Sequence, residues 1–254
     1  MSLRLLFASL ERQTTRDFEL IVADDGSSDD TEELCNQSPL RPRFITQEDK
    51  GYRKARILNE AIHSAASDYL IFLDADVIVE RHFVEDHLRL RSAGAFVCGR
   101  RVDLGPEFSR KLSLSDILAG KLDGISIRLI RSALDKDTLN IKRALRIPSE
   151  RLRAAMGYRK PIDILGSNFS AWKRDLIEIN GFNEALESYW GEDGDLFIRL
   201  RNSRKRAIGA KGLCVQFHVF HPRRAPTQEN VEKVSALLGN LEYRRAEKGY
   251  DARF

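Results

Sequence analysis

The stretch from Tyr69 to Asp76, YLIFLDAD, constrains the fold most, because a run of apolar residues ends there in two carboxylates. Five consecutive apolar residues predict a strand buried on both faces, as in the centre of a parallel sheet. Open α/β sheets bind ligands beyond the carboxyl ends of their strands. Asp74 and Asp76 would stand at that edge, where a hard divalent cation can hold a phosphate against carboxylate oxygens. The alternative is that both are solvated loop acids that end an ordinary strand.

Apolar strands and amphipathic helices alternate on both sides of this stretch. Residues 1–13 predict a helix, and residues 18–23, FELIVA, predict a strand that brings the acidic turn DDGSSDDT to the same edge. Further strands are expected at 43–46 and 95–99, with helices near 57–65 and 81–91. This order is typical of a doubly wound parallel sheet with right-handed crossovers. A chain of 254 residues suits one large α/β domain or two small ones.

Three cations begin the helix that precedes YLIFLDAD. Arg53, Lys54 and Arg56 lie where free backbone N–H groups and the helix dipole favour an anion. A diphosphate would bind well there, although surface cations at a helix start give the same pattern.

The second half of the sequence contains one more acidic motif and one pair of histidines. Glu192 and Asp193 precede a helix, so negative charge falls at its N-terminal end, where it is stabilised. A last strand is expected over 212–219; His218 lies on it, and His221 follows at the chain turn. Spacing of three residues across a strand end lets both imidazoles face one point, which a carboxylate metal site would use. Helix-start acids and structural histidines are the simpler interpretation.

The net charge of +4 is concentrated in one segment, residues 100–161. From Arg100 to Lys160 there are 15 Lys and Arg against 7 Asp and Glu, a net of +8. Such a field suits phosphates, lipid head groups or nucleic acid. Helical stretches at 125–134 and 139–145 would lie on a membrane surface, cover the site as a lid, or pack as ordinary helices. Nucleic-acid binding is disfavoured, because stacking aromatics and reader motifs are missing.

The expected cellular compartment follows from the lack of a recognisable membrane span or signal peptide in the sequence. No run approaches the roughly 20 apolar residues of a membrane span, and no signal peptide is recognisable. We therefore expect a cytoplasmic protein, with peripheral contact at the inner face of the membrane through the basic segment as a further option. Cys35, Cys98 and Cys214 have no zinc or redox spacing, and we expect reduced, packed thiols.

Taken together, the motifs resemble the glycosyltransferase family 2 enzymes of the GT-A fold, in the subgroup whose second half is similar to the galactosyltransferase C-terminal region. The matching segments, in the family's order, are FELIVADDGSSDDT, YLIFLDADVIV, GSNFSAWKRDLIEINGFNE, WGEDGDLFIRL and HVFHP. The resemblance implies a single α/β domain with a Rossmann-like, doubly wound mixed sheet. Its parts would be a nucleotide-sugar-binding half (1–99), a basic helical insert (100–161), an acceptor and catalytic half (162–226) and a C-terminal helix (227–254).

The resemblance also implies a UDP-sugar site with a divalent metal, Mn²⁺ or Mg²⁺. Asp24 and Asp25 would hold uracil and ribose, and Asp74 would contact ribose or metal-bound water. Asp76 would bind the metal directly. His221 would be a further ligand, and His218 stands where some relatives place another.

Catalytic roles come from the second half of the resemblance. Asp193 is similar to the catalytic base of inverting relatives, and Glu192 would orient the acceptor or donor sugar. Gly166 to Asn168, which we expect to end a strand that starts at residue 162, would line the sugar pocket together with Trp190. Inverting transfer needs one carboxylate base and stabilisation of the departing diphosphate, whereas a covalent retaining route needs a second, nucleophilic carboxylate that we do not find. The acceptor would be a glycan or a lipid-linked glycan.

The sequence departs from the family at its start. The family begins with a strand ending in a Thr-Tyr-Asn-like turn, and this sequence begins at the helix after it, as a trimmed or differently started version of a longer protein would. We expect the missing strand to leave ladder groups unpaired and to impair donor binding unless another segment fills the gap. The alternative function is a catalytically silent nucleotide-sugar or glycan-binding module on the same fold.

Overall fold

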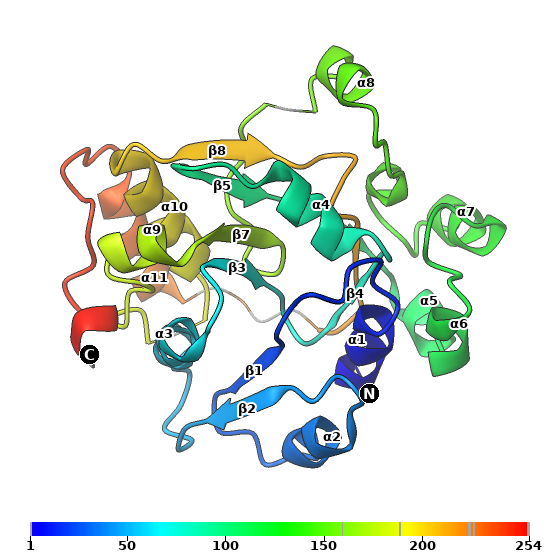
Figure 1. Ribbon diagram of the computed structural model, residues 1–254, viewed down its shortest axis with the longest axis horizontal. Coiled ribbons are helices and arrows are strands. Elements are labelled where there is room, and N and C mark those ends of the chain that lie inside the picture. The colour runs from blue at the N-terminus through cyan, green and yellow to red at the C-terminus, as the bar shows by residue number, and fades with distance from the viewer. Residues whose placement is uncertain (1, 159, 188, 223–224, 226, 253–254) are drawn as a thin grey trace.

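The computed structural model describes residues 2–158, 160–187, 189–222, 225 and 227–252 of the chain (Figure 1). Its N-terminal part is a small parallel unit. Helix α1 (Ser2–Leu10) leads into β1 (Ile21–Asp24), and α2 (Thr31–Gln37) connects β1 to β2 (Arg43–Thr46). Strands β1 and β2 pair in parallel over their whole length and form a two-stranded sheet.

The central sheet has four strands in the order β3-β7-β5-β8. They are β3 (Tyr69–Phe72), β5 (Ala95–Cys98), β7 (Phe169–Trp172) and β8 (Arg206–Gly209). Strand β7 runs antiparallel to both β3 and β5, while β5 and β8 are parallel. The helices around it are α3 (Lys54–Ser64), α4 (Phe83–Leu90), α9 (Lys173–Glu178) and α10 (Glu192–Asn202). Part of the core is a stacked pair of rings, Phe72 and Phe169, with centroids 4.4 Å apart.

A third sheet brings two distant acidic and imidazole motifs together. Its order is β4-β9-β6, from β4 (Val77–Val79), β6 (Arg101–Asp103) and β9 (Gln216–His218). Strand β4 follows Asp76 directly, and Val77 pairs with His218 across the antiparallel ladder. The register of this pair therefore fixes His218 beside the end of YLIFLDAD.

Residues 104–156 are mainly short helices at one side of the molecule (Figure 1). These are α5 (Pro106–Arg110), α6 (Leu114–Leu118), α7 (Ile127–Leu134), η1 (Ile141–Ala144) and α8 (Glu150–Ala155). Leu129 of α7 and Phe108 of α5 are buried in the same cluster as Phe217 of β9. The chain closes with α11 (Gln228–Leu237) and η2 (Tyr250–Ala252).

Several expected elements differ from the structure. Strand β3 is neither central nor parallel to its neighbour: it is an edge strand, antiparallel to β7, and all four of its residues are half-buried. The reason is that its second edge faces a cleft. The strand expected from residue 162 to Gly166 is also wrong, because β7 begins only at Phe169. The last strand is confined to Gln216–His218, and the C-terminal helix ends at Leu237.

The prediction for the three thiols is confirmed. Cys35, Cys98 and Cys214 are free and buried. After β6, the described residues of the insert form short helices joined by loops. In the part of the chain that the structure describes, no helix has the length and apolar character needed to cross a bilayer. The division of the chain at residues 99, 161 and 226 stays a prediction.

Candidate active site

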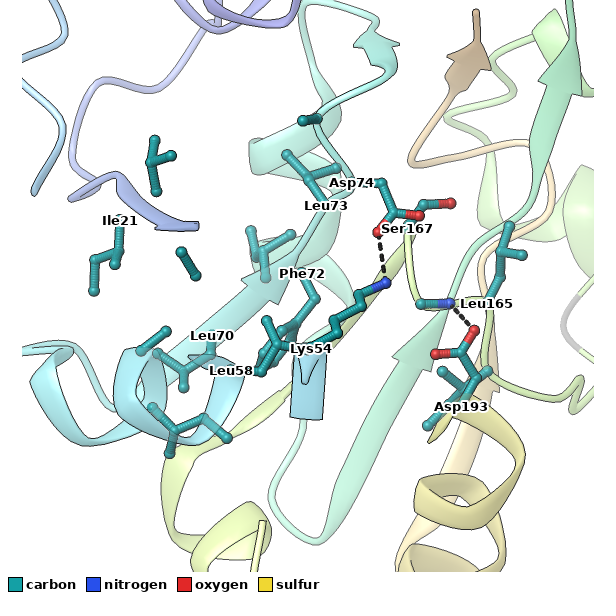
Figure 2. Close-up of a pocket in the computed structure, with 18 of the residues that line it drawn as sticks. Ile21, Lys54, Leu58, Leu70, Phe72, Leu73, Asp74, Leu165, Ser167 and Asp193 are labelled. Carbon is teal, nitrogen blue, oxygen red and sulfur yellow. Dashed lines mark hydrogen bonds and ion pairs between the residues drawn. The ribbon is translucent and has the colours of Figure 1, made fainter. Parts of the chain in front are cut away.

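A cleft of about 1420 Å³ opens between β1, β3 and the start of α10. Figure 2 shows its two parts: apolar side chains, including Ile21, Leu58 and Leu70, on one side, and Lys54 and Asp193 with other polar groups on the other. The polar part lies beyond the ends of β1 and β3. Ligands of open α/β sheets bind at such an edge.

Asp76, His218 and His221 form one cluster in the polar part. The Nε2 atoms of His221 and His218 lie 2.9 and 3.4 Å from Oδ2 of Asp76. The two imidazole Nε2 atoms are 3.2 Å apart, and one ligand atom from each residue falls within 4.8 Å of the others. The sequence prediction that these three residues face one point is therefore matched by the geometry.

The cluster has the donor atoms that a divalent metal needs. Oδ1 of Asp76 is buried without a hydrogen-bond partner in the part of the chain that the structure describes. An orphaned carboxylate oxygen next to two imidazoles fits a cation, and a mixed carboxylate and imidazole set suits Mn²⁺ better than Mg²⁺, which prefers oxygen ligands only. His218 is fixed by β9 and nearly buried, whereas the side chain of His221 is 44 % exposed.

Lys54 is the cation at the centre of the polar part. Its Nζ donates to Oδ1 of Asp74 at 2.9 Å and lies 3.6 Å from Oε1 of Glu192 (Figure 2 shows the Asp74 contact). Burial alone lowers the pKa of Lys54, but Asp74, Glu192 and Asp193 raise it well above its usual value. Lys54 is therefore a fixed positive charge, and it connects the end of β3 to the start of α10.

Asp193 projects from the first turn of α10 toward the loop before β7. Its Oδ2 accepts a hydrogen bond of 2.7 Å from the backbone N–H of Gly166 (Figure 2). Burial, with help from Glu192 and Asp74, raises the pKa of Asp193 to about 7, although Lys54 and the Gly166 N–H oppose the shift. A carboxylate that titrates near neutral pH can accept a proton from an attacking hydroxyl.

Gly166 is required beside Asp193, because a Cβ there would lie 2.3 Å from Oδ1 of that carboxylate. The turn before α10 is similarly constrained. Trp190 has a φ of +83° and Gly191 a φ of +110°. Few non-glycine residues adopt positive φ, and those that do are often held at functional sites. The Trp190 side chain is 43 % exposed and borders the cleft.

The two acids after β1 have different surroundings. Oδ2 of Asp24 accepts from the backbone N–H groups of Gly26 and Ser27 and from Thr46. Burial opposes its ionisation, but these hydrogen bonds outweigh burial and lower the pKa of Asp24. Asp24 thus fixes the turn. Asp25 lines the cleft and accepts from the backbone N–H of Arg53 at 2.6 Å.

Three residues predicted for the site lie away from the cleft lining. Arg53 is the N-cap residue of α3 and its guanidinium donates to the Glu48 carbonyl, while Arg56 lies on the same helix outside the described lining of the cleft. Asn168 is fully buried and bridges the carbonyls of Arg100 and Cys214. Within the described lining, these side chains do not join the polar group around Lys54.

Sequence reasoning missed two aromatic side chains. Tyr52 donates to Oε1 of Glu192 at 3.0 Å, and its ring meets Tyr189 edge to face, with centroids 6.1 Å apart. Both line the cleft. The signal was present, since Tyr52 stands within two residues of Lys54 and Tyr189 directly precedes Trp190.

Comparison with known proteins places this geometry in a family. The model of glycosyl transferase family 2 matches residues 2–162, well over half of the chain. The chain belongs to glycosyl transferase family 2. A second model, described as the N-terminal domain of galactosyltransferase, matches residues 149–221, so the two together cover the cleft from α1 to His221.

A curated relative and two solved structures agree with this family. Validoxylamine A glucosyltransferase of Streptomyces hygroscopicus subsp. jinggangensis is 37 % identical over 91 residues, which is 34 % of this chain and 22 % of the relative. The structure of S. aureus TarS 1-349 in complex with UDP has a TM-score of 0.58 at 14 % identity over 99 % of this chain and 64 % of that one.

A mannosyltransferase, PcManGT from Pyrobaculum calidifontis in complex with GDP-Man and Mn²⁺, has a TM-score of 0.55 at 15 % identity over 94 % of this chain and 66 % of that one. The structural likeness confirms the GT-A fold. The chain spans less than two thirds of each of these three proteins.

Proposed function

We propose that the protein is a metal-dependent inverting glycosyltransferase that moves a sugar from a UDP-sugar to a glycan or lipid-linked acceptor. The observation that carries the proposal is the meeting of two groups in one cleft: Asp193, with its raised pKa, and the Asp76, His218 and His221 cluster. An inverting transfer needs a base on one side of the sugar and positive charge around the departing diphosphate.

Asp193 would act as the general base. Its carboxylate is held by the Gly166 N–H, so the oxygen not bonded there is oriented for the acceptor hydroxyl. Glu192 next to it accepts from Tyr52 and lies near Lys54, which suits a residue that positions a sugar hydroxyl. One carboxylate base without a nucleophilic partner favours direct displacement with inversion.

Asp76, His218 and His221 would hold Mn²⁺, which would supply positive charge for the diphosphate. Lys54 adds a second cation beside Asp74 at the ends of β3 and α3. Asp25, together with the turn that Asp24 fixes, would contact the nucleoside. UDP is supported by the UDP complex of S. aureus TarS, and the GDP-Man complex of PcManGT makes GDP the competing donor nucleotide.

The insert would bring the enzyme to an acceptor at an anionic membrane surface. Among large apolar side chains of the described residues, most exposed ones lie between residues 114 and 156. On α7, Ile127 and Leu134 are 72 and 76 % exposed, and Arg131 is exposed beside them. Apolar side chains interleaved with cations are typical of helices that lie in the interface of anionic lipids.

The test is a sugar-transfer and hydrolysis assay with UDP- and GDP-sugars in the presence of Mn²⁺. Wild type should release UDP, and Asp193→Asn should lower the rate by at least about 10²-fold, the range of general-base catalysis. Glu232→Gln, which changes an exposed acid on α11, is the matched control and should keep full activity. Equal rates for Asp193→Asn and wild type would refute the proposed base.

A silent nucleotide-sugar-binding module is the second candidate, favoured by the open cleft beside the half-buried β3. Thermal shift with UDP, GDP and Mn²⁺ distinguishes the two, because a ligand that binds only the folded state raises the melting temperature. A shift with UDP and Mn²⁺ but no release of UDP from any UDP-sugar would favour the module.

A further inference from the structure

The turn that begins α10 has a strained backbone. Its two residues, Trp190 and Gly191, have φ angles of +83° and +110°. Gly191 is the N-cap of α10, and Glu192 and Asp193 follow it directly. A tryptophan at positive φ is disfavoured because its Cβ crowds the backbone, and such a conformation persists only where the surrounding contacts hold it. The direction in which the two acids leave the turn therefore depends on those contacts.

Helix α11 supplies one of these contacts through Asn230. The helix packs beside α10 (Figure 1). Nδ2 of Asn230 donates to the carbonyl oxygen of Trp190 at 2.6 Å, and Asn230 is only 1 % exposed. A hydrogen bond with so little access to water holds the carbonyl in one direction, because water does not compete for it. Asn230 thus fixes the peptide group that joins Trp190 to Gly191.

The start of α11 holds Asn230 in turn. Thr227 is the N-cap of α11, and its side-chain oxygen accepts from the backbone N–H of Asn230. Such a cap orders the first turn of a helix. The side chain of Asn230 reaches from this ordered turn to a carbonyl that lies 40 residues earlier in the sequence. No local sequence pattern predicts such a contact.

Val234, one helical turn after Asn230, packs against the same turn. A Cβ at Gly191 would lie 2.9 Å from Cγ2 of Val234, and a Cβ at Gly194 would lie 3.4 Å from Cγ1. Val234 is buried and lines the cleft. Helix α11 therefore contacts the start of α10 from two successive turns of its own.

The groups that face Asp193 come from other elements. Burial is the largest cause of its raised pKa. Lys54 of α3 and the Gly166 N–H lower that pKa, whereas Glu192 and Asp74 raise it. These groups act on the carboxylate, but the turn before α10 sets where its backbone lies. If the first turn of α10 moved toward water, the pKa of Asp193 would fall.

We propose that Asn230 is a positioning residue for the two acids at the start of α10. By holding the carbonyl of Trp190, it directs Glu192 and Asp193 into the cleft. Asn230 lies outside the described lining of the cleft, so it acts through the backbone of the turn. The role of Asp193 as a base rests on the proposed function, whereas its placement by Asn230 does not.

The first experiment measures the ionisation of Asp193 without any substrate. Asn230→Leu removes the donor and keeps a side chain of similar size, so the turn should relax and Asp193 should gain water. The pKa of Asp193, about 7 in the wild type, should fall by at least about one unit toward the ordinary value near 4. NMR titration of ¹³C-labelled aspartate carboxyl groups measures this. The Asp193 signal is the one that is lost in Asp193→Asn.

Asn202→Leu is the matched control. Asn202 is the last residue of α10, and its amide donates to the carbonyls of Asn240 and Tyr243, both at 2.8 Å. This variant should lower the melting temperature but leave the pKa of Asp193 unchanged. Asn230→Ser is a second variant that disturbs the packing less. Its side chain is too short to hold the Trp190 carbonyl in the same way, so it should shift the pKa in the same direction.

Sugar-transfer kinetics test the consequence for the proposed reaction. Asn230→Leu should lower kcat by about 10–100-fold and change KM for the UDP-sugar by less than about threefold, because a displaced reacting group costs rate more than binding. An unchanged pKa of Asp193 in both Asn230 variants would overturn the positioning role, and so would an equal fall in Asn202→Leu. A fall confined to the Asn230 variants, with no transfer by the wild type, would support positioning and contradict the proposed function.

Discussion

Asp193 gives the molecule its clearest pH-dependent feature. Its pKa is raised to about 7, chiefly by burial, so the folded state binds this proton more tightly than the unfolded state does. Between the ordinary carboxyl pKa near 4 and pH 7, the unfolded chain has lost the proton while the folded chain keeps it. The contribution of Asp193 to the free energy of unfolding is therefore at its full value below about pH 4. This contribution is lost as the pH rises through 7.

Asp193→Asn should consequently have opposite effects on activity and stability. At pH 8 the neutral amide avoids a buried charge, so the variant should be more stable than wild type by about 1–3 kcal/mol. At pH 5 the difference should shrink, because wild type is then protonated. Urea unfolding at both pH values measures this. A variant less stable than wild type at pH 8 would show that burial does not dominate this carboxylate.

The pH profile of transfer follows from the same group. A base must be ionised to act, so kcat/KM should rise about tenfold per pH unit below 7 and level off above it. Steady-state kinetics from pH 5.5 to 8.5 measure this. A flat profile over that range would place the ionisation elsewhere.

His221 offers a test of the metal cluster. His221→Ala removes the most exposed side chain of the proposed ligand set and should raise the Mn²⁺ concentration for half-maximal binding by about 10–100-fold. Calorimetric titration of the protein with Mn²⁺ measures this without any substrate. His63→Ala, on α3 away from the cluster, is the control and should leave Mn²⁺ binding unchanged. Unchanged binding by His221→Ala would remove this residue from the site.

At the residue scale, the sequence predicted that Asp76, His218 and His221 face one point, and the structure brings these three side chains together. Asp76 directly precedes β4, and His218 pairs with Val77, the first residue of that strand. Asn168 shows where prediction of the site from the sequence fails. Its position in the motif predicted a place in the sugar pocket, but the side chain is fully buried and donates to two backbone carbonyls. Only the packing of β5, β7 and residue 214 shows that these carbonyls need a hydrogen-bond donor.

Among the elements, α10 carries Asp193, the proposed base, and is anchored by a buried ion pair. Arg199 is fully buried, donates to Asp195 one turn earlier, and also donates to the carbonyls of Ile179 and Gly181. Helix α10 is therefore fixed to the loop after α9. This anchoring holds Asp193 in place from the far end of its own helix.

Removing that anchor should destabilise the fold strongly. Arg199→Met leaves Asp195 charged and buried without its partner, which costs about 3–5 kcal/mol. Arg201→Met, on the same helix but at an exposed position where the guanidinium lies over the Phe197 ring, should cost less than about 1 kcal/mol. Urea denaturation followed by circular dichroism compares the two. Similar losses for both variants would contradict the anchoring role.

The apolar periodicity of the sequence predicted the order of the strands along the chain, but it did not predict which strands pair. Apolar runs located β1, β2, β3 and β5 within a few residues. The antiparallel insertion of β7 between β3 and β5 joins segments about a hundred residues apart, and no local pattern encodes such a pairing. The family resemblance supplied the fold where periodicity alone suggested an all-parallel sheet.

For the whole molecule, the insert gives one side of the surface a distinct character. Its short helices expose Ile127 and Leu134 in a segment with a net charge of +8. Membrane association would then depend on both apolar burial and anionic lipid.

Vesicle co-sedimentation tests that surface. Wild type should bind vesicles that contain phosphatidylglycerol, and a variant with Ile127→Ser and Leu134→Ser should bind about tenfold less. The matched control changes Leu238 and Leu241 to Ser, which are 67 and 66 % exposed but lie outside the insert. It should bind like wild type. Equal loss in both double variants, or equal binding to neutral vesicles, would contradict an interfacial role for the insert.

Among the described strands, β1 and β3 each have one edge without a partner strand, which has a consequence for handling the protein in solution. Exposed strand edges beside apolar side chains are templates for pairing between molecules, the step that precedes cross-β aggregation. Residues 1–254 alone should therefore lose monomer over days at high concentration, with rising thioflavin fluorescence.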